Sequence, residues 1–238
     1  MAFDRKMFGR GLKNGIPIAL GYLSVSFAFG MMAVESGMSP WLALLISMTN
    51  LTSAGQVAGT ELIAAGGTYL EIFVTTIVIN LRYALMSLSL SQKLDEMMPK
   101  LARILLPFGN TDEIFAVAMQ QNGVVTASYL SGLIVMPYIG WSVGTILGAT
   151  MMSLLPEILR GALGLALYGM FIAIIIPVTK RKKSIAFTVV VAAVLSILFY
   201  YTPGLNRLSG GWVIIICSIT SAAAAAILYP FKGASEEA

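Results

Sequence analysis

One arginine of this sequence lies in the middle of a long apolar stretch. Arg82 is part of Ile79-Asn80-Leu81-Arg82-Tyr83 and has ten uncharged residues on each side. An arginine at the centre of a spanning helix costs about 2.5–3.5 kcal/mol, so it must face protein or water and have a partner. A guanidinium can bind a substrate carboxylate through two hydrogen bonds, which makes Arg82 a candidate substrate-binding residue. Asn80, two residues before it, is a further candidate. The alternative is a structural ion pair with Glu61, Asp112 or Glu113.

A second concentration of polar groups lies in the segment Asn50–Gln56, inside the stretch 41–66. The stretch is long enough to cross a membrane, but its middle is polar and contains glycine, which indicates a broken or re-entrant helix. Amides, hydroxyls and freed backbone groups could then bind the polar end of a substrate. The alternative is hydrogen bonding between helices. The candidate substrate-binding residues here are Asn50, Thr52, Ser53, Gly55 and Gln56.

Acidic residues supply a third kind of chemistry. Asp112 and Glu113 follow Asn110 and Thr111, a pattern typical of a helix start with acidic groups in its first turn. They could simply compensate the helix dipole, or one of them could be a protonatable carboxylate coupled to transport. Glu61 is a further candidate for the coupling role.

The composition defines the environment in which these groups act. Of the 238 residues, 58% are hydrophobic and only 11% are charged, against about 25% charged residues in soluble proteins. This composition indicates an integral membrane protein. It has no histidine and a single cysteine, Cys217, which excludes a histidine-dependent triad and an internal disulfide. We expect no metal site, no cofactor and no enzymatic activity, because the sequence shows no recognisable metal or nucleophile motif. We also expect no nucleic-acid partner, because the basic residues lie in short blocks between apolar runs, which is the pattern of membrane topology.

The predicted fold is an all-α, polytopic membrane bundle of six to eight spans with broken or re-entrant helices. Residues 1–14 are a basic cytoplasmic N-terminus, 15–232 a single transmembrane domain and 233–238 a disordered tail. A spanning helix needs about 20 apolar residues. The stretches that qualify are 15–34, 69–92, 124–151, 160–179, 184–202 and 209–230.

The distribution of the basic residues favours one of the possible membrane topologies. If 41–66 enters and leaves on the same side, twelve of the fifteen basic residues lie on one side of the membrane. The positive-inside rule then puts both termini in the cytoplasm, in an inner-membrane protein. An eight-pass arrangement, in which 41–66 crosses and 104–121 crosses back, ranks second. In the preferred arrangement, residues 111–121 form a half-length helix that dips in from the cytoplasm.

Several short motifs together resemble those of the AzlC family. They are Gly15-Ile16-Pro17-Ile18-Ala19-Leu20-Gly21-Tyr22, Phe27-Ala28-Phe29-Gly30, Ser53-Ala54-Gly55-Gln56, Asn80-Leu81-Arg82-Tyr83 and Asn110-Thr111-Asp112-Glu113. The resemblance covers nearly the whole chain and is most specific over residues 15–115. Where many relatives have histidine, this chain has Tyr83, so no coupling scheme can use an imidazole there.

The resemblance implies the large subunit of a branched-chain amino acid exporter, paired with a small AzlD-like membrane subunit. The implied substrates are leucine, isoleucine and valine, in some members methionine, and toxic analogues such as azaleucine. On this hypothesis, Arg82 takes the substrate carboxylate and the segment around Ser53, Gly55 and Gln56 takes the amino group. The other hypotheses are a transporter of another small solute, a membrane-embedded enzyme and an assembly subunit with no pathway of its own.

Overall fold

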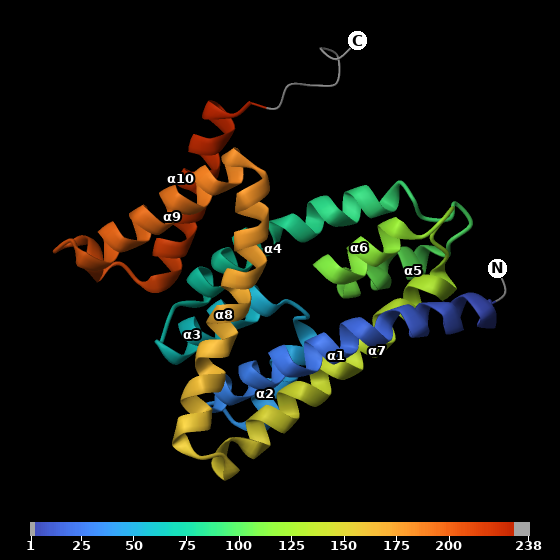
Figure 1. Ribbon diagram of the computed structural model, residues 1–238, viewed down its shortest axis with the longest axis horizontal. Coiled ribbons are helices and arrows are strands. Elements are labelled where there is room, and N and C mark those ends of the chain that lie inside the picture. Colours follow the sequence, from blue (N-terminus) through green and yellow to red (C-terminus); the bar gives the residue numbers. More distant parts are fainter. Residues whose placement is uncertain (1–2, 231–238) are drawn as a thin grey trace.

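The computed structural model describes residues 3–230, apart from several side chains between residues 153 and 181. The expected tail, 233–238, lies outside the described residues. The described part is helical and confirms the all-α membrane bundle (Figure 1). The helices are α1 (Arg5–Glu35), α2 (Pro40–Thr49), α3 (Ser53–Ala64), α4 (Tyr69–Ser91), α5 (Lys100–Leu105), the 3-10 helix η1 (Leu106–Gly109), α6 (Asp112–Gln120), α7 (Ala127–Met151), η2 (Met152–Leu154), α8 (Glu157–Arg181), α9 (Lys183–Tyr201), η3 (Leu205–Arg207) and α10 (Gly210–Leu228).

Five of these helices, α1, α4, α7, α9 and α10, are long and apolar enough to cross a membrane. They correspond to five of the six predicted spans. The sixth predicted stretch, 160–179, lies within α8, which has 25 residues. The first helix begins at Arg5, ten residues earlier than the predicted span, because Asp4 accepts hydrogen bonds from the Lys6 and Met7 amides and caps it.

Helices α1 and α7 form a closely packed parallel pair along one side of the molecule (Figure 1). Glycines allow the backbones to touch: a Cβ atom on Gly11 would lie 2.2 Å from the Tyr129 carbonyl oxygen, and one on Gly148 would lie 1.9 Å from the Phe27 carbonyl oxygen. Because residue numbers increase together along the two helices, both cross in the same direction. If 41–66 crossed fully and the six predicted spans were the other crossings, α1 and α7 would cross in opposite directions, so the parallel pair excludes that topology.

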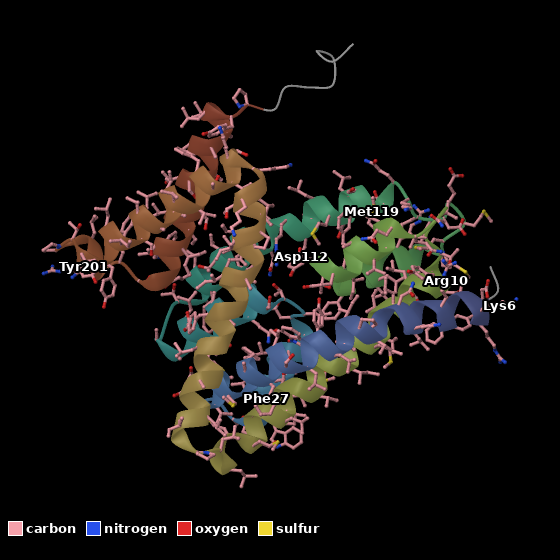
Figure 2. All side chains as sticks on the ribbon, in the orientation of Figure 1. Lys6, Arg10, Phe27, Asp112, Met119 and Tyr201 are labelled. Atoms are coloured by element: carbon pink, nitrogen blue, oxygen red, sulfur yellow. The ribbon has the colours of Figure 1, made fainter. Side chains whose placement is uncertain are left out.

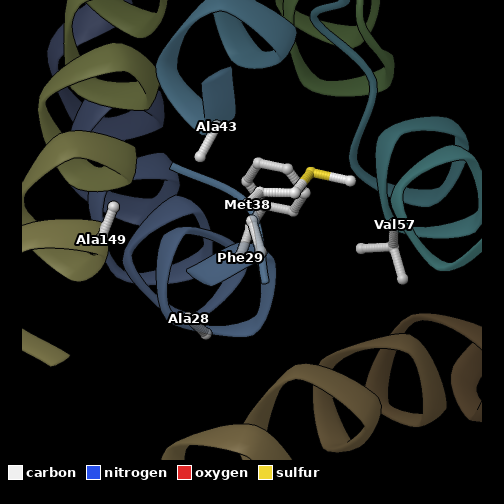
Figure 3. Close-up of a cluster of buried hydrophobic side chains, with 7 residues drawn as sticks. Ala28, Phe29, Met38, Ala43, Val57 and Ala149 are labelled. Carbon is white, nitrogen blue, oxygen red and sulfur yellow. The ribbon is translucent and has the colours of Figure 1, made fainter. Parts of the chain in front are cut away.

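The stretch 41–66 is broken at residues 50–52, as the sequence predicts, and it folds back on itself. Gln56 donates a hydrogen bond to Ser47, and Val57 shares a buried cluster with Met38 and Ala43 (Figure 3). In a continuous helix, residues 43 and 57 would be about 20 Å apart. We call residues 40–64, which comprise α2 and α3, the first re-entrant segment.

The chain between α4 and α7 also leaves and returns at one end of the bundle. Asp95 donates a backbone hydrogen bond to Val125, and the Val125 amide donates one to Lys93. The N-terminus lies at this same end, because the Asp4 amide donates to Ser128. We call residues 100–120 the second re-entrant segment; its last helix, α6, is the predicted half-length helix. Both segments favour the six-crossing arrangement over the eight-pass one.

Helix α8 packs against α1 and leads to α9, and α9 packs against α10, which also contacts α4 (Figure 1). Glu71, in the first turn of α4, is buried and accepts hydrogen bonds from the Ser209 hydroxyl and, at 3.0 Å, from the Gly211 amide. A carboxylate at a helix N-terminus is favourable, so Glu71 fastens the start of α10 to the start of α4.

Candidate functional site

A cavity of about 620 Å³ lies between the two re-entrant segments, α1, α4, α7 and α8. This volume falls within the range of about 300–1,000 Å³ that is usual for small-molecule sites. Most of its wall is apolar, and the polar groups come from the breaks and from α4. The lining residues are Pro17, Ile18, Gly21, Tyr22, Val25, Leu51, Ser53, Ala54, Arg82, Tyr83, Thr111, Asp112, Glu113, Trp141 and Ile175.

The N-termini of two half-length helices reach this cavity. Ser53 and Ala54 begin α3, while Asp112 and Glu113 begin α6. Helix N-termini carry unpaired backbone N–H groups and a partial positive charge. Each re-entrant segment breaks because polar residues interrupt its apolar helix. In the second segment, Pro107 and Gly109 also interrupt the helix. The two breaks face each other across the cavity.

The two N-termini differ in charge. In α6, Thr111 caps the helix by accepting a hydrogen bond from the Ile114 amide, and two carboxylates stand in the first turn. In α3, the residue before the helix, Thr52, makes no side-chain capping bond within the described structure, and the first turn holds no acidic residue. At the cavity, the N-terminus of α3 therefore keeps its partial positive charge, whereas the carboxylates in the first turn of α6 make its N-terminus negative.

Arg82 is paired with Asp112 across the cavity. Its guanidinium also lies 4.8 Å from the centre of the Tyr83 ring and donates a hydrogen bond of 3.1 Å to the Tyr83 hydroxyl. Figure 2 shows Asp112 at the end of α6 nearest the centre of the molecule. Of the three partners expected for Arg82, the structure selects Asp112. Both side chains keep about two fifths of their surface accessible, so a ligand in the cavity can reach them.

Glu113 is held by a tyrosine from α1. The Tyr22 hydroxyl is hydrogen-bonded to the Glu113 carboxylate and, at 2.6 Å, to the Thr111 hydroxyl. The ring of Tyr22 packs edge-on against Trp141, with ring centres 5.0 Å apart. The sequence reasoning did not single out Tyr22 or Trp141 as site residues. Their signal was weak, because aromatic residues in apolar helices usually pack in the core.

Three of the predicted residues, Thr52, Gly55 and Asn80, contact one another where the first break packs against α4. The Thr52 hydroxyl donates to Asn80 Oδ1 at 2.8 Å and accepts from the Tyr83 hydroxyl at 3.3 Å. Gly55 packs closely on the same Asn80 amide: a Cβ atom there would lie 3.1 Å from it. These contacts fix the first break against α4. Asn50, Thr52 and Asn80 line a second, smaller cavity of about 160 Å³.

Gln56 lies away from both cavities and is buried between helices. Its amide nitrogen donates to Ser47 at 3.1 Å, and its Oε1 accepts from the Trp141 ring nitrogen at 3.2 Å. Ser47 in turn is hydrogen-bonded to Thr145 on α7 at 2.7 Å. Gln56 therefore ties the first re-entrant segment to α7, which is the structural alternative considered for this stretch.

The remaining predicted acid, Glu61, is exposed and accepts a hydrogen bond of 3.3 Å from the Tyr168 hydroxyl. It does not line the large cavity, unlike Asp112 and Glu113. The structure thus brings Arg82, Ser53, Asp112 and Glu113 together at one cavity and keeps Glu61 apart from them.

These features define a multi-pass membrane protein whose re-entrant half-helices enclose a charged site. The family model described as AzlC protein matches residues 17–155, which is more than half of the chain, and the chain belongs to the AzlC family. It is 27% identical over 237 residues to "Inner membrane protein YgaZ" of Escherichia coli (strain K12), covering 97% of this chain and 94% of that protein. It is 32% identical over 178 residues to a membrane protein of Archaeoglobus fulgidus, covering 74% and 78% of the two chains. No solved structure matches the chain.

Proposed function

We propose that this protein is a secondary transporter that exports branched-chain amino acids across the cytoplasmic membrane together with a small AzlD-like membrane subunit. The substrates would be leucine, isoleucine and valine, with methionine and toxic analogues as further ones. The observation that carries the proposal is a cavity that holds opposite charges, from Arg82 and Asp112, and is otherwise lined mainly by apolar side chains. A zwitterion with an aliphatic side chain has the same distribution of charge.

The substrate carboxylate would bind at the N-terminus of α3. Backbone N–H groups and the Ser53 hydroxyl can donate to it, the helix dipole favours it, and Arg82 supplies the countercharge. This differs from the expectation that the break takes the amino group. The reason is that Ser53 stands at the positive end of a helix and that Gln56 Oε1 already accepts from Trp141.

The substrate ammonium would bind at the N-terminus of α6, to Asp112 and Glu113. In the empty cavity, Asp112 and Arg82 neutralise each other, which avoids leaving either charge unpaired at low dielectric. On binding, the zwitterion exchanges partners with them: its carboxylate replaces Asp112 at Arg82, and its ammonium replaces Arg82 at Asp112. The empty and the loaded carrier would then both reorient without an unpaired charge.

The aliphatic side chain would occupy the apolar part of the cavity. Val25 and Ile18 of α1, Leu51 of the first break, Trp141 of α7 and Ile175 of α8 line it. A methylene group added or removed in such a pocket changes affinity only modestly, by about 1–3 kcal/mol. The site would therefore accept several aliphatic amino acids rather than one.

The test is efflux of labelled leucine from preloaded cells, with and without a co-expressed small partner subunit. Arg82→Ala should abolish efflux while the protein remains in the membrane, and Arg207→Ala, at an exposed arginine outside the cavity, should not. Normal efflux by the Arg82 variant would overturn the carboxylate assignment. No leucine efflux from wild-type cells under either condition would point to another solute, or to an assembly subunit without its own pathway.

A further inference from the structure

The smaller cavity, of about 160 Å³, lies on the other side of the same two breaks. It shares Leu51 and Tyr83 with the large cavity, so a wall of one is a wall of the other. The large cavity receives the N-termini of the half-helices. The small one is lined instead by Thr49, the last residue of α2, and by Pro107 and Phe108, the two middle residues of the four-residue helix η1.

Helix C-termini offer carbonyl oxygens and a partial negative charge, the reverse of the N-termini. The side chains around this cavity add amide and hydroxyl oxygens from Asn50, Thr52 and Asn80. Neither a basic nor an acidic side chain lines it among the described residues. In broken-helix transporters in general, unwound carbonyls and half-helix C-termini of this kind coordinate a coupling cation.

One residue of this lining, Asn110, has a side-chain oxygen without a partner among the described residues. Asn110 is only 3% exposed, and its Oδ1 has no hydrogen-bond partner among the described residues. Its amide nitrogen donates to the Ser87 hydroxyl at 3.0 Å, which leaves Oδ1 as the free end of the amide. Buried acceptors are almost always satisfied in proteins, so this oxygen calls for a partner that is not a protein group, such as a water molecule or an ion.

We infer that the small cavity is a binding site for a monovalent metal cation, Na⁺, held by Asn110 Oδ1 and the neutral oxygens of the two breaks. A neutral oxygen set suits a singly charged ion, because Ca²⁺ and Mg²⁺ sites in proteins rely on carboxylates. The volume exceeds the roughly 30 Å³ share of one water molecule, so an ion can keep part of its hydration shell. Binding of the ion does not depend on the proposed function, whereas its role as the coupling ion does.

The shared wall allows an ion in the small cavity to influence substrate binding in the large one. Tyr83 stands between the cavities, with Arg82 stacked on its ring and Thr52 hydrogen-bonded to its hydroxyl. An ion that fixes the oxygens of the first break also fixes Ser53, the next residue of the chain, at the substrate side. Occupancy of the small cavity therefore changes the affinity of the large one.

The test uses the purified full-length protein without substrate and measures its thermal midpoint in NaCl, KCl or choline chloride at constant ionic strength. NaCl should raise the midpoint in a saturable way above choline chloride, with KCl weaker. Asn110→Ala should weaken the apparent Na⁺ affinity at least about tenfold, and Asn122→Ala, an exposed asparagine in the loop before α7, should not. A midpoint that is the same in all three salts, or an unchanged Na⁺ response in the Asn110→Ala variant, would overturn the site.

A gain-of-function variant keeps the test decisive if Asn110→Ala fails to fold. Asn110→Asp places a carboxylate in the cavity and should tighten Na⁺ binding and introduce a response to Ca²⁺. Failure to change either response would count against the site. Leucine efflux measured with and without an inward Na⁺ gradient then examines coupling separately. Na⁺ binding without an effect on efflux would retain the ion site and remove only its role in transport.

Discussion

The two re-entrant segments have the same architecture but opposite charge. Each enters the bundle, breaks near its middle where an asparagine and a threonine precede the next helix, and presents the N-terminus of a short helix to one cavity. The first break leaves that N-terminus without a side-chain cap or acid in the described structure, whereas the second adds Asp112 and Glu113 to it. A half-helix therefore fixes the position of its N-terminus, and the residues of its first turn determine the charge at that position.

The largest effect should come from making the first segment resemble the second. Ser53→Asp places a carboxylate at the start of α3, where the helix dipole stabilises it, but it repels a substrate carboxylate. We expect leucine efflux to fall more than about a hundredfold, because like charges in contact cost several kcal/mol. The thermal midpoint should not fall.

Ser53→Ala is the matched control, since it removes only the hydroxyl and should reduce efflux far less than the aspartate does. Equal losses in the two variants would mean that charge at α3 is irrelevant, and the contrast between the segments would then have no functional meaning.

The next largest effect should come from neutralising the second segment. Asp112→Asn removes the charged partner of the substrate ammonium and of Arg82. A hydrogen bond to a charged group contributes about 1.5–3 kcal/mol, so leucine affinity should fall about tenfold to a hundredfold.

Two analogues of leucine identify which end of the substrate is affected. Isoamylamine keeps the amino group and lacks the carboxylate, and isocaproate does the reverse. Competition by isoamylamine should weaken in Asp112→Asn, while competition by isocaproate should hold or improve. The opposite pattern would reverse our assignment of the two helix ends.

A smaller effect is expected from loosening the first segment without touching its charge. Gln56→Leu leaves the Trp141 ring nitrogen and Ser47 without the partners they have now. Unsatisfied buried groups cost about 1–3 kcal/mol each, so the thermal midpoint should fall. The relative efflux of leucine and valine should stay the same, because Gln56 does not line the cavity.

Gln92→Leu, at an exposed position that ends α4, serves as the control for the change of side chain. A shift in the leucine-to-valine ratio in Gln56→Leu would return Gln56 to the substrate site that its sequence context first indicated.

Much of this arrangement follows from the sequence. Apolar runs of spanning length, the polar break at residues 50–52 and the Asn-Thr-Asp-Glu helix start all encode local structure, which residue type and spacing determine directly. The partner of Arg82 could not be predicted, because Asp112 is 30 residues away and three acids were equally eligible. The burial of Gln56 against Trp141 and the contact of Tyr22 with Glu113 depend equally on how distant helices pack, which one sequence does not encode locally.

The smallest effect on leucine efflux is expected at Glu61, which lies away from the N-termini of α3 and α6. Glu61 is exposed on α3 and accepts a hydrogen bond from Tyr168, and the amide oxygen of Glu61→Gln can still accept it. Surface substitutions of this kind change stability by less than about 0.5 kcal/mol, and efflux should stay within about twofold of the wild type. Glu113→Gln, inside the cavity and bonded to Tyr22, should reduce leucine efflux more than Glu61→Gln does. A larger loss of efflux in Glu61→Gln than in Glu113→Gln would mean that the carboxylate needed for transport lies outside the cavity, and the charge of the second segment would then have no role in it.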